Sequence, residues 1–314
     1  MALPQPKVDG AEALLSRDEA QATPAPAAWE AEIRADAAVR LRAVGGPVRR
    51  DEYWRYTDPA PFMADTADMG AAQTGEHADF SAHTGLHFGF TDGVLDQPSG
   101  AQAAVDGLET SSLAEALAED DHWSKDLFAQ LEMDGQNPVS RPLAIYNTAR
   151  ATEGLALRAT APVESPVIVT YRAQDSSDAD HLTRHVVRVE AGASLTVLEA
   201  GPASARCFQT MEVEVAPGGS FHHVRLQGPE ESGVFNTHLF ARLGEGSEFK
   251  SFTLAANGTM TRNECVIWFT GDDAQATVAG AALGRGKGFH HDDTVFVTHD
   301  AVNCESRQVF KKVL

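Results

Sequence analysis

The chain has few cysteines and no segment with the properties of a membrane anchor. Its three cysteines, Cys207, Cys265 and Cys304, lie far apart, and no two have the CxxC spacing of a classical zinc site. A disulfide framework is therefore excluded, and we expect small buried thiols in a reducing, cytoplasmic compartment. No apolar run approaches the length that crosses a bilayer, and the N-terminus has no basic stretch followed by an apolar one. We expect neither a membrane span nor a secretion signal.

Positive charge is also scarce, and the usual motifs of catalysis are missing. Lys and Arg number 25 against 45 Asp and Glu, and the net charge of −20 argues against a nucleic-acid or anionic-membrane surface. No Ser-His-Asp or GxSxG arrangement is evident. Residues 284–288 hold Lys287 among glycines, but the glycine spacing of a phosphate loop is absent and no Ser or Thr follows the lysine. We interpret this segment as a glycine-rich turn.

The second half of the sequence contains a motif that recurs. Each copy reads as an apolar residue, two further residues, Gly or Asp, two more residues, an apolar residue and then a short strand. Successive copies start about 26 to 28 residues apart, a period typical of repeat architectures. A fainter start at Val163 precedes them. The clear copies begin at Val189, Val215 and Leu243, with Gly192, Gly218 and Gly246 at their fourth positions. A weaker copy begins at Phe269, with Asp272 at its fourth position.

The contents of the repeat favour a β-solenoid. No copy contains an amphipathic run of helical length, whereas apolar residues such as Leu195 and Val197 alternate beside each corner. A strand, a glycine corner and a second strand describe one coil of a parallel β-helix. In such a coil Val189, Val215 and Leu243 would occupy equivalent inward positions. An antiparallel β-sandwich or a cupin-like barrel, with hairpins of similar spacing, is the alternative.

The first half of the sequence mixes helical and strand patterns. Residues 29–41 have one apolar helical face, which ends at Gly45, and we expect a helix end to need its glycine less than a repeat corner does. Three aromatic residues within residues 53–56 are interpreted as an anchor for the N-terminal segment. Residues 86–90 alternate as a strand before an Asp-Gly turn, a capping box at Ser112 opens a helix, and a second helical patch covers residues 123–131.

We place a domain boundary near residue 140. After Pro138 the helical patterns stop, and strand patterns begin at Leu143. The prediction is an N-terminal helical and mixed domain at residues 1–140 and a β-helix core at residues 141–314.

Histidines and one cysteine form the most suggestive chemical pattern. His222 and His223 lie on a repeat strand, and residues 290–293 read His-His-Asp-Asp, so alternate members of that run share a face. His299 and Cys304 follow five residues apart, and an imidazole with a thiolate suits iron or zinc. We therefore name His299 and Cys304 as candidate metal ligands. The alternative is that these are ordinary surface residues.

Several motifs, in order along the chain, resemble the SufB/SufD family. The run Cys-Glu-Ser-Arg-Gln at 304–308, which follows His299, is similar to that family's Cys-x-Ser-Arg-Gln signature. Residues 54–58 read Trp-Arg-Tyr-Thr-Asp, like the family's N-terminal phrase. Residues 88–93, followed by 112–117, resemble the lead-in of SufD, and the short N-terminal part is more similar to SufD than to SufB. The resemblance runs from about residue 50 to the end of the sequence.

The resemblance implies a right-handed parallel β-helix with an N-terminal α-helical domain. It also implies a non-catalytic scaffold subunit of the SufBCD complex, which builds iron–sulfur clusters. The implied partners are SufB and the ATPase SufC, with no nucleic acid and no membrane. The chain alone would bind no cofactor tightly, and iron or a cluster would occupy a transient site at an interface with SufB. A His-rich, metal-dependent β-fold enzyme of the cupin type is the alternative.

The resemblance further implies a missing C-terminal part. Members of the family usually continue beyond Leu314 with a segment that closes the β-helix and a helical region that docks the ATPase. We therefore expect this chain to be C-terminally incomplete, to bind SufC poorly and SufB weakly, and to self-associate through an open last coil.

Overall fold

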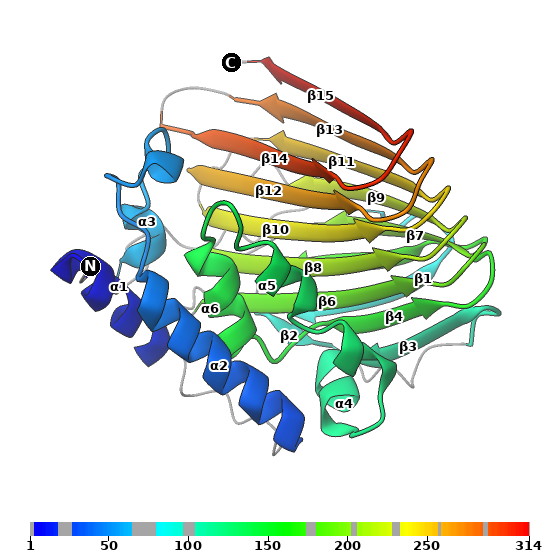
Figure 1. The fold of residues 1–314 in the computed structure, drawn as a ribbon, viewed down its shortest axis with the longest axis horizontal. Helices are drawn as coiled ribbons and strands as arrows, with labels where there is room; N and C mark the ends of the chain where they lie inside the picture. Colours follow the sequence, from blue (N-terminus) through cyan, green and yellow to red (C-terminus); the bar gives the residue numbers. More distant parts are fainter. Residues whose placement is uncertain are drawn as a thin grey trace.

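The chain folds as a parallel β-solenoid of about five turns, with helices contributed by its N-terminal half (Figure 1). The computed structural model describes residues 3–17, 27–64, 80–96, 104–173, 180–201, 206–227, 233–256, 259–284 and 288–313. From β4 to β15, each strand pairs in parallel with the strand two places further along the chain. The predicted parallel β-helix is therefore confirmed, and the antiparallel sandwich or cupin-like barrel is wrong.

Successive strands alternate between two sheets. Sheet A has the order β15-β13-β11-β9-β7-β5-β1-β2, and sheet B has the order β14-β12-β10-β8-β6-β4-β3. The strands of sheet A are β1 (Leu86–Thr91), β2 (Val94–Leu95), β5 (Val167–Arg172), β7 (Ser194–Ala200), β9 (Ser220–Gln227), β11 (Glu248–Ala256), β13 (Gln275–Leu283) and β15 (Glu305–Val313). The strands of sheet B are β3 (Leu108–Ser112), β4 (Leu155–Ala159), β6 (His181–Val189), β8 (Arg206–Val215), β10 (Val234–Leu243), β12 (Met260–Phe269) and β14 (His291–His299).

The repeat found in the sequence sets the register of sheet B. Val189 pairs with Val215, Val215 pairs with Leu243, and Leu243 pairs with Phe269. All four side chains are buried in the core between the two sheets. Burying an apolar side chain of this size contributes about 1.5–3 kcal/mol relative to leaving it in water. The predicted inward ladder is confirmed.

Each coil passes from sheet B to sheet A through a tight corner. Gly192, Gly218 and Gly246 have φ of 71°, 66° and 61°, a region that glycine enters without a steric penalty. Their N–H groups donate to carbonyls of the next coil, at Pro217, Glu245 and Asp272 respectively. The corners thus form a hydrogen-bonded ladder of their own.

The corner after β12 differs from the one predicted. Its left-handed residue is Asp273, with φ of 60°, and not Asp272. The reason is an extra residue between the end of β12 and the start of β13. The next corner also places a non-glycine residue, Asn303, at φ of 58°. Asparagine and aspartate tolerate this conformation because their short polar side chains form local hydrogen bonds.

The first coil also starts at a different residue from the one predicted. Ala159, and not Val163, pairs with Val189. Val163 instead donates its N–H to the carbonyl of Ser194, which is the first residue of β7 in sheet A.

Helices cover the outer face of sheet B (Figure 1). α6 packs on β6 and β8, and α5 packs on β8 and β10. The predicted strand at Leu143 is wrong, because those residues form α6. This helix has only nine residues, too few for a helical period to stand out from a short apolar run. The helical elements are α1 (Gln5–Ser16), α2 (Ala28–Val44), η1 (Glu52–Trp54), α3 (Ala60–Met63), α4 (Leu113–Ala118), η3 (Trp123–Asp126), α5 (Gln130–Asp134) and α6 (Pro142–Arg150).

The other N-terminal predictions are largely confirmed. The helix at residues 29–41 is α2, the strand at residues 86–90 is β1, and the Asp-Gly turn joins β1 to β2. The capping box between Ser112 and Glu115 opens α4, and the second helical patch splits into η3 and α5. The centre of the predicted glycine-rich turn lies outside the described residues. In the part of the chain described, no helix combines the length and the apolar character needed to cross a bilayer.

Candidate functional site

The predicted metal pair lies at the last corner of the solenoid. His299 ends β14 and Cys304 directly precedes β15. The His299 ring packs on Phe269 with ring centroids 4.7 Å apart, and its Nε2 lies 3.2 Å from the hydroxyl of Ser306. The half-buried Cys304 thiol lies 3.3 Å from the carbonyl oxygen of Gly271. The corner thus brings an imidazole and a thiol to the same end of one coil, each held by its own neighbours.

This pair is not part of a larger set of ligands within the described chain. The described residues contain no group of three or more His, Cys, Asp or Glu side chains placed to hold a metal ion. An iron–sulfur cluster is normally held by four ligands. His299 and Cys304 therefore supply at most half of such a set.

The other two thiols are buried in the protein. Cys207 is 3% exposed and Cys265 is 8% exposed. Burial raises the pKa of each thiol to about 12, so both are protonated at neutral pH. A protonated thiol is neither a good nucleophile nor a metal ligand. The prediction of small buried thiols is confirmed for these two, while Cys304 is partly exposed.

A buried ionic cluster lies between the two sheets. Glu199 Oε2 accepts hydrogen bonds from Arg225 Nη2 at 2.7 Å and Nε at 3.0 Å, and it lies 2.6 Å from His223 Nε2. Glu199 Oε1 accepts a hydrogen bond from the hydroxyl of Tyr171 at 2.8 Å, and that hydroxyl lies 2.6 Å from His185 Nε2. All five side chains are buried. The cluster is therefore a closed, satisfied network.

The hydrogen bonds of this cluster form one consistent chain when both histidines are neutral. The first N–H of β4 donates to Nδ1 of His185, so Nε2 carries the proton and donates to Tyr171, whose hydroxyl donates to Glu199. His223 accepts from the hydroxyl of Ser251 at Nδ1 and donates from Nε2 to Glu199. Every ring nitrogen of these two buried histidines is thus satisfied.

Burial and the ion pair set the protonation states of the cluster. Burial lowers the pKa of His185 to about 4, against the attraction of Glu199. Burial also lowers the pKa of His223, although the hydrogen bond to Glu199 opposes this. Burial alone would raise the pKa of Glu199, but the Arg225 guanidinium and His223 outweigh it and hold that pKa well below its usual range. At neutral pH the cluster therefore contains one carboxylate, one guanidinium and two neutral imidazoles.

Polar side chains continue from this cluster along the inside of sheet B. Thr183, Gln209, Thr237, Asn263 and Asp293 stand in register on five successive strands. The Thr237 hydroxyl donates to Asn263 at 2.8 Å, and Asn263 donates to Asp293 at 3.2 Å. A cavity of about 30 Å³ lies beside this row, between β9, β11, β12 and β14. Such a cavity has room for one or two water molecules but not for an organic substrate.

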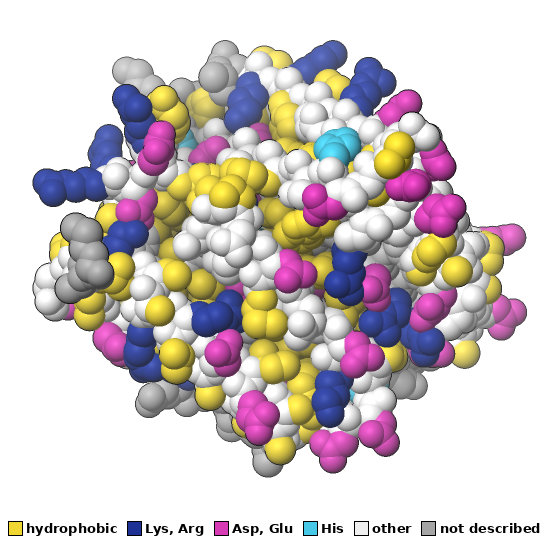
Figure 2. Space-filling view, in the orientation of Figure 1, with side chains coloured by type: hydrophobic (Ala, Val, Ile, Leu, Met, Phe, Trp, Pro, Cys, Tyr) yellow, Lys and Arg dark blue, Asp and Glu magenta, His cyan; other side chains and the backbone are white. Residues whose placement is uncertain are grey.

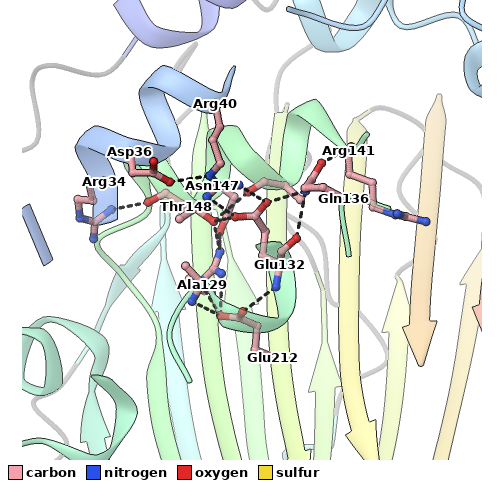
Figure 3. Close-up of polar contacts among 12 residues, drawn as sticks. Arg34, Asp36, Arg40, Ala129, Glu132, Gln136, Arg141, Asn147, Thr148 and Glu212 are labelled. Carbon is pink, nitrogen blue, oxygen red and sulfur yellow. Dashed lines mark hydrogen bonds and ion pairs between the residues drawn. The ribbon is translucent and has the colours of Figure 1, made fainter. Parts of the chain in front are cut away.

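Buried ion pairs fasten the helices to the outer face of sheet B (Figure 3). Arg184 Nη2 on β6 lies 2.7 Å from Glu212 Oε2 on β8, and both side chains are fully buried. Glu212 also accepts hydrogen bonds from the N–H groups of Ala129 and Glu132 at the start of α5, at 2.9 and 3.0 Å. Arg40 on α2 forms an ion pair with Glu132 at 2.9 Å. These contacts join two strands and two helices in one network.

Residues 53–57 attach the N-terminal segment to β12. The Arg262 guanidinium lies 4.6 Å from the centre of the Tyr53 ring and 4.2 Å from the centre of the Trp54 ring. The Tyr53 hydroxyl donates to Glu264 at 2.6 Å, and Arg141 Nε donates to the same carboxylate oxygen at 3.1 Å. The interpretation of this aromatic run as an anchor is confirmed for Tyr53 and Trp54, whereas Tyr56 is 82% exposed.

The same segment reaches β14 through Thr57. Its hydroxyl donates to Asp292 at 2.5 Å and lies 2.9 Å from Nε2 of His290, so these two residues share a face as predicted. Asp292 also lies 2.5 Å from Nη1 of Arg262. His290 and Asp292 are thus occupied in holding the N-terminal segment.

The ionic cluster is the feature that sequence reasoning missed. His223 was singled out, but Glu199 and Arg225 were not. Both follow the inward alternation of their strands, after Val197 and His223 respectively. The cluster could have been predicted from a carboxylate and a guanidinium at inward positions of adjacent coils, because buried charges occur as pairs.

The architecture and these networks define a solenoid with a packed interior and helices fastened along one face. Residues 171–314 match the family model described as SUF system FeS cluster assembly, SufBD core domain. This match supports an assignment to the SufB/SufD family and a role in iron–sulfur cluster assembly. No curated protein matches the chain.

Proposed function

We propose that this chain is a SufD-like scaffold subunit of the SufBCD complex, which works through its surfaces and catalyses no reaction itself. The observation that carries the proposal is the SufBD core match over residues 171–314, on a parallel solenoid. The buried charges support it, because Glu199 and Glu212 are each neutralised by a buried arginine and act as structural groups. SufB and the ATPase SufC are the proposed partners, with ATP hydrolysis belonging to SufC. A cytoplasmic location accords with this assignment.

We also propose where iron or a cluster passes. His299 and Cys304 would supply ligands from the last corner, and SufB would supply the others, so that the site exists only at the interface. The partly exposed Cys304 thiol and the two-ligand limit of this corner support a shared, transient site. The cluster is cargo in this proposal.

Co-expression with SufB and SufC from the same source tests the function. Affinity purification of this chain is expected to recover SufB and, through SufB, the more weakly bound SufC. ATPase activity is expected in that complex but not in this chain alone. A complex of SufB and SufC that forms without recruiting this chain would contradict the scaffold role. ATP hydrolysis by the purified chain would contradict its non-catalytic nature.

A further inference from the structure

The outer face of sheet A, on the side of the solenoid away from α5 and α6, is divided into a polar half and an apolar half. Its outward residues stand in register on successive strands, so they form rows that cross the strands. One row is wholly apolar: Ile168, Leu198, Val224, Phe252, Ala279 and Val309. The row two residues further along the strands is mostly apolar: Thr170, Ala200, Leu226, Leu254, Ala281 and Lys311.

The part of this apolar half from β9 to β15 is partly open to solvent, whereas Ile168, Thr170 and Ala200 at its other end are buried. Phe252 is 37% exposed, and Leu283 and Val313, at the ends of β13 and β15, are 44% and 63% exposed. Leu198 and Val224 are half-exposed. The solvent-facing side of a sheet is normally polar. A contiguous exposed apolar patch of this kind marks an interaction surface.

Basic residues border the apolar row on its other side. Two positions before Val224, Phe252 and Val309 stand His222, Lys250 and Arg307. The same row holds Thr196 on β7 and Thr277 on β13. Glu248 lies 3.1 Å from His222 and 2.6 Å from Lys250, and Glu305 stands in line with Glu248 at the start of β15. The helix-covered face, by contrast, mixes both charge signs without such an order (Figure 2).

We propose that this amphipathic face of sheet A docks a partner segment that has one apolar side and one carboxylate-rich side. From β7 to β15 the apolar row crosses four inter-strand steps of about 4.8 Å each, roughly 19 Å, which is the length of a helix of about 13 residues. The basic row lies about 7 Å from the apolar row, within the width of a single helix. One acidic amphipathic helix therefore reaches both rows, in the manner of helix-in-groove recognition.

A second copy of the chain fits this face poorly. Two copies can face each other across a two-fold axis that brings their apolar rows together. If the axis runs along the strands, the basic row of one copy meets the basic row of the other. If the axis runs along the rows, the basic row of one copy meets the second apolar row of the other. Neither arrangement pairs opposite charges, and each copy carries a net charge of −20. The charge pattern thus favours a foreign, acidic partner.

The test uses the full chain and fluorescently labelled peptides of about 16 residues, long enough to cover the apolar row. One peptide is an amphipathic helix of leucine and glutamate, and its counterpart has lysine in place of glutamate. Fluorescence anisotropy at low salt is expected to show binding of the glutamate peptide and at least about tenfold weaker binding of the lysine peptide. Phe252→Ser and the double variant Lys250→Glu, Arg307→Glu are each expected to weaken binding of the glutamate peptide about tenfold.

Two matched variants serve as controls, and circular dichroism melts verify that every variant folds. Val39→Ser removes a valine that is 62% exposed on α2, and Arg50→Glu reverses an exposed charge away from sheet A, so both are expected to bind like the parent chain. Absent binding of the glutamate peptide, equal binding of the two peptides, or unchanged binding by folded Phe252→Ser overturns the proposal. A dimer in light scattering that Phe252→Ser dissociates assigns the face to a second copy and overturns it as well. None of these outcomes depends on SufB or SufC.

Discussion

The left-handed glycines of this chain differ in how much space surrounds them. An added Cβ at Gly246 would meet no atom within 4 Å, and at Gly218 the nearest atom lies 4.0 Å away. At Gly45, with φ of 77°, an added Cβ would lie 2.6 Å from Cβ of Lys7 and 3.0 Å from its carbonyl oxygen. The expectation that Gly45 matters less than a corner glycine is therefore wrong, because the end of α2 packs closely against α1.

We predict that Gly218→Ala lowers the free energy of unfolding by about 1 kcal/mol, from backbone strain alone. Gly45→Ala is expected to lower it by about 2–3 kcal/mol, because overlap with Lys7 adds to the strain. Urea unfolding followed by circular dichroism measures both values. A larger loss at Gly218 than at Gly45 would show that the corners, and not the helix contact, are the tighter positions.

The buried histidine His185 makes the stability depend on pH. Its pKa is about 4 in the folded chain and about 6.5 when exposed, so its contribution is fully present above pH 6.5 and is lost as the pH falls towards 4. The difference corresponds to about 3 kcal/mol at the acid end of this range. We predict that His185→Gln, which keeps a donor and an acceptor, flattens the stability profile between pH 6.5 and 4.5.

Urea midpoints measured across that pH range test this prediction, with the exposed His83→Gln as the matched control for replacing a histidine. An unchanged slope in His185→Gln would mean that His185 is not the group that takes up the proton.

At the scale of elements, strand β8 carries two outward glutamates that differ in environment. Glu212 is fully buried between Arg184 and the start of α5, whereas Glu214 is 22% exposed between Arg188 and Arg242. We predict that Glu212→Ala costs about 3–5 kcal/mol, because it leaves a buried arginine unpaired. Glu214→Ala, two residues along on the same face, is expected to cost about 1 kcal/mol or less. Chemical unfolding of both variants provides the measurement, and equal losses would show that the helices do not depend on Glu212.

The same elements show what the sequence can predict. Period and alternation are local properties, so the inward ladder of Val189, Val215 and Leu243 and the corner glycines followed directly from the sequence. α6 did not, because a nine-residue helix is too short for its period to be distinguished from a short apolar run. Contacts such as Tyr53 with Glu264 join residues more than two hundred positions apart and leave no local pattern. His299 and Cys304 were named from their spacing in the sequence, but the neighbours that hold His299, Phe269 and Ser306, could not be predicted in this way.

At the scale of the whole molecule, the described residues bring together too few candidate ligands to hold a cluster. We predict that anaerobic reconstitution of the isolated chain with iron and sulfide leaves no cluster after desalting, whereas the complex with SufB and SufC retains one. Cys304→Ala is expected to reduce the cluster content of that complex, measured by absorbance and iron analysis. A near-stoichiometric cluster on the isolated chain that Cys304→Ala abolishes would contradict this prediction.

The attachment of N-terminal segments along sheet B also affects how the solenoid responds to force. The hydrogen bonds between coils run along the solenoid axis, so tension applied to the last strand breaks them row by row, and an unbraced stack would peel apart at low load. Here β15 pairs only with β13 among the described strands, whereas β14 is also held to residues 53–57 through Asp292 and Arg262. Single-molecule pulling from the C-terminus is therefore expected to show a weak first event as β15 detaches. The next event should need a higher force, because the release of β14 must also break the contacts of Asp292 with Thr57 and Arg262.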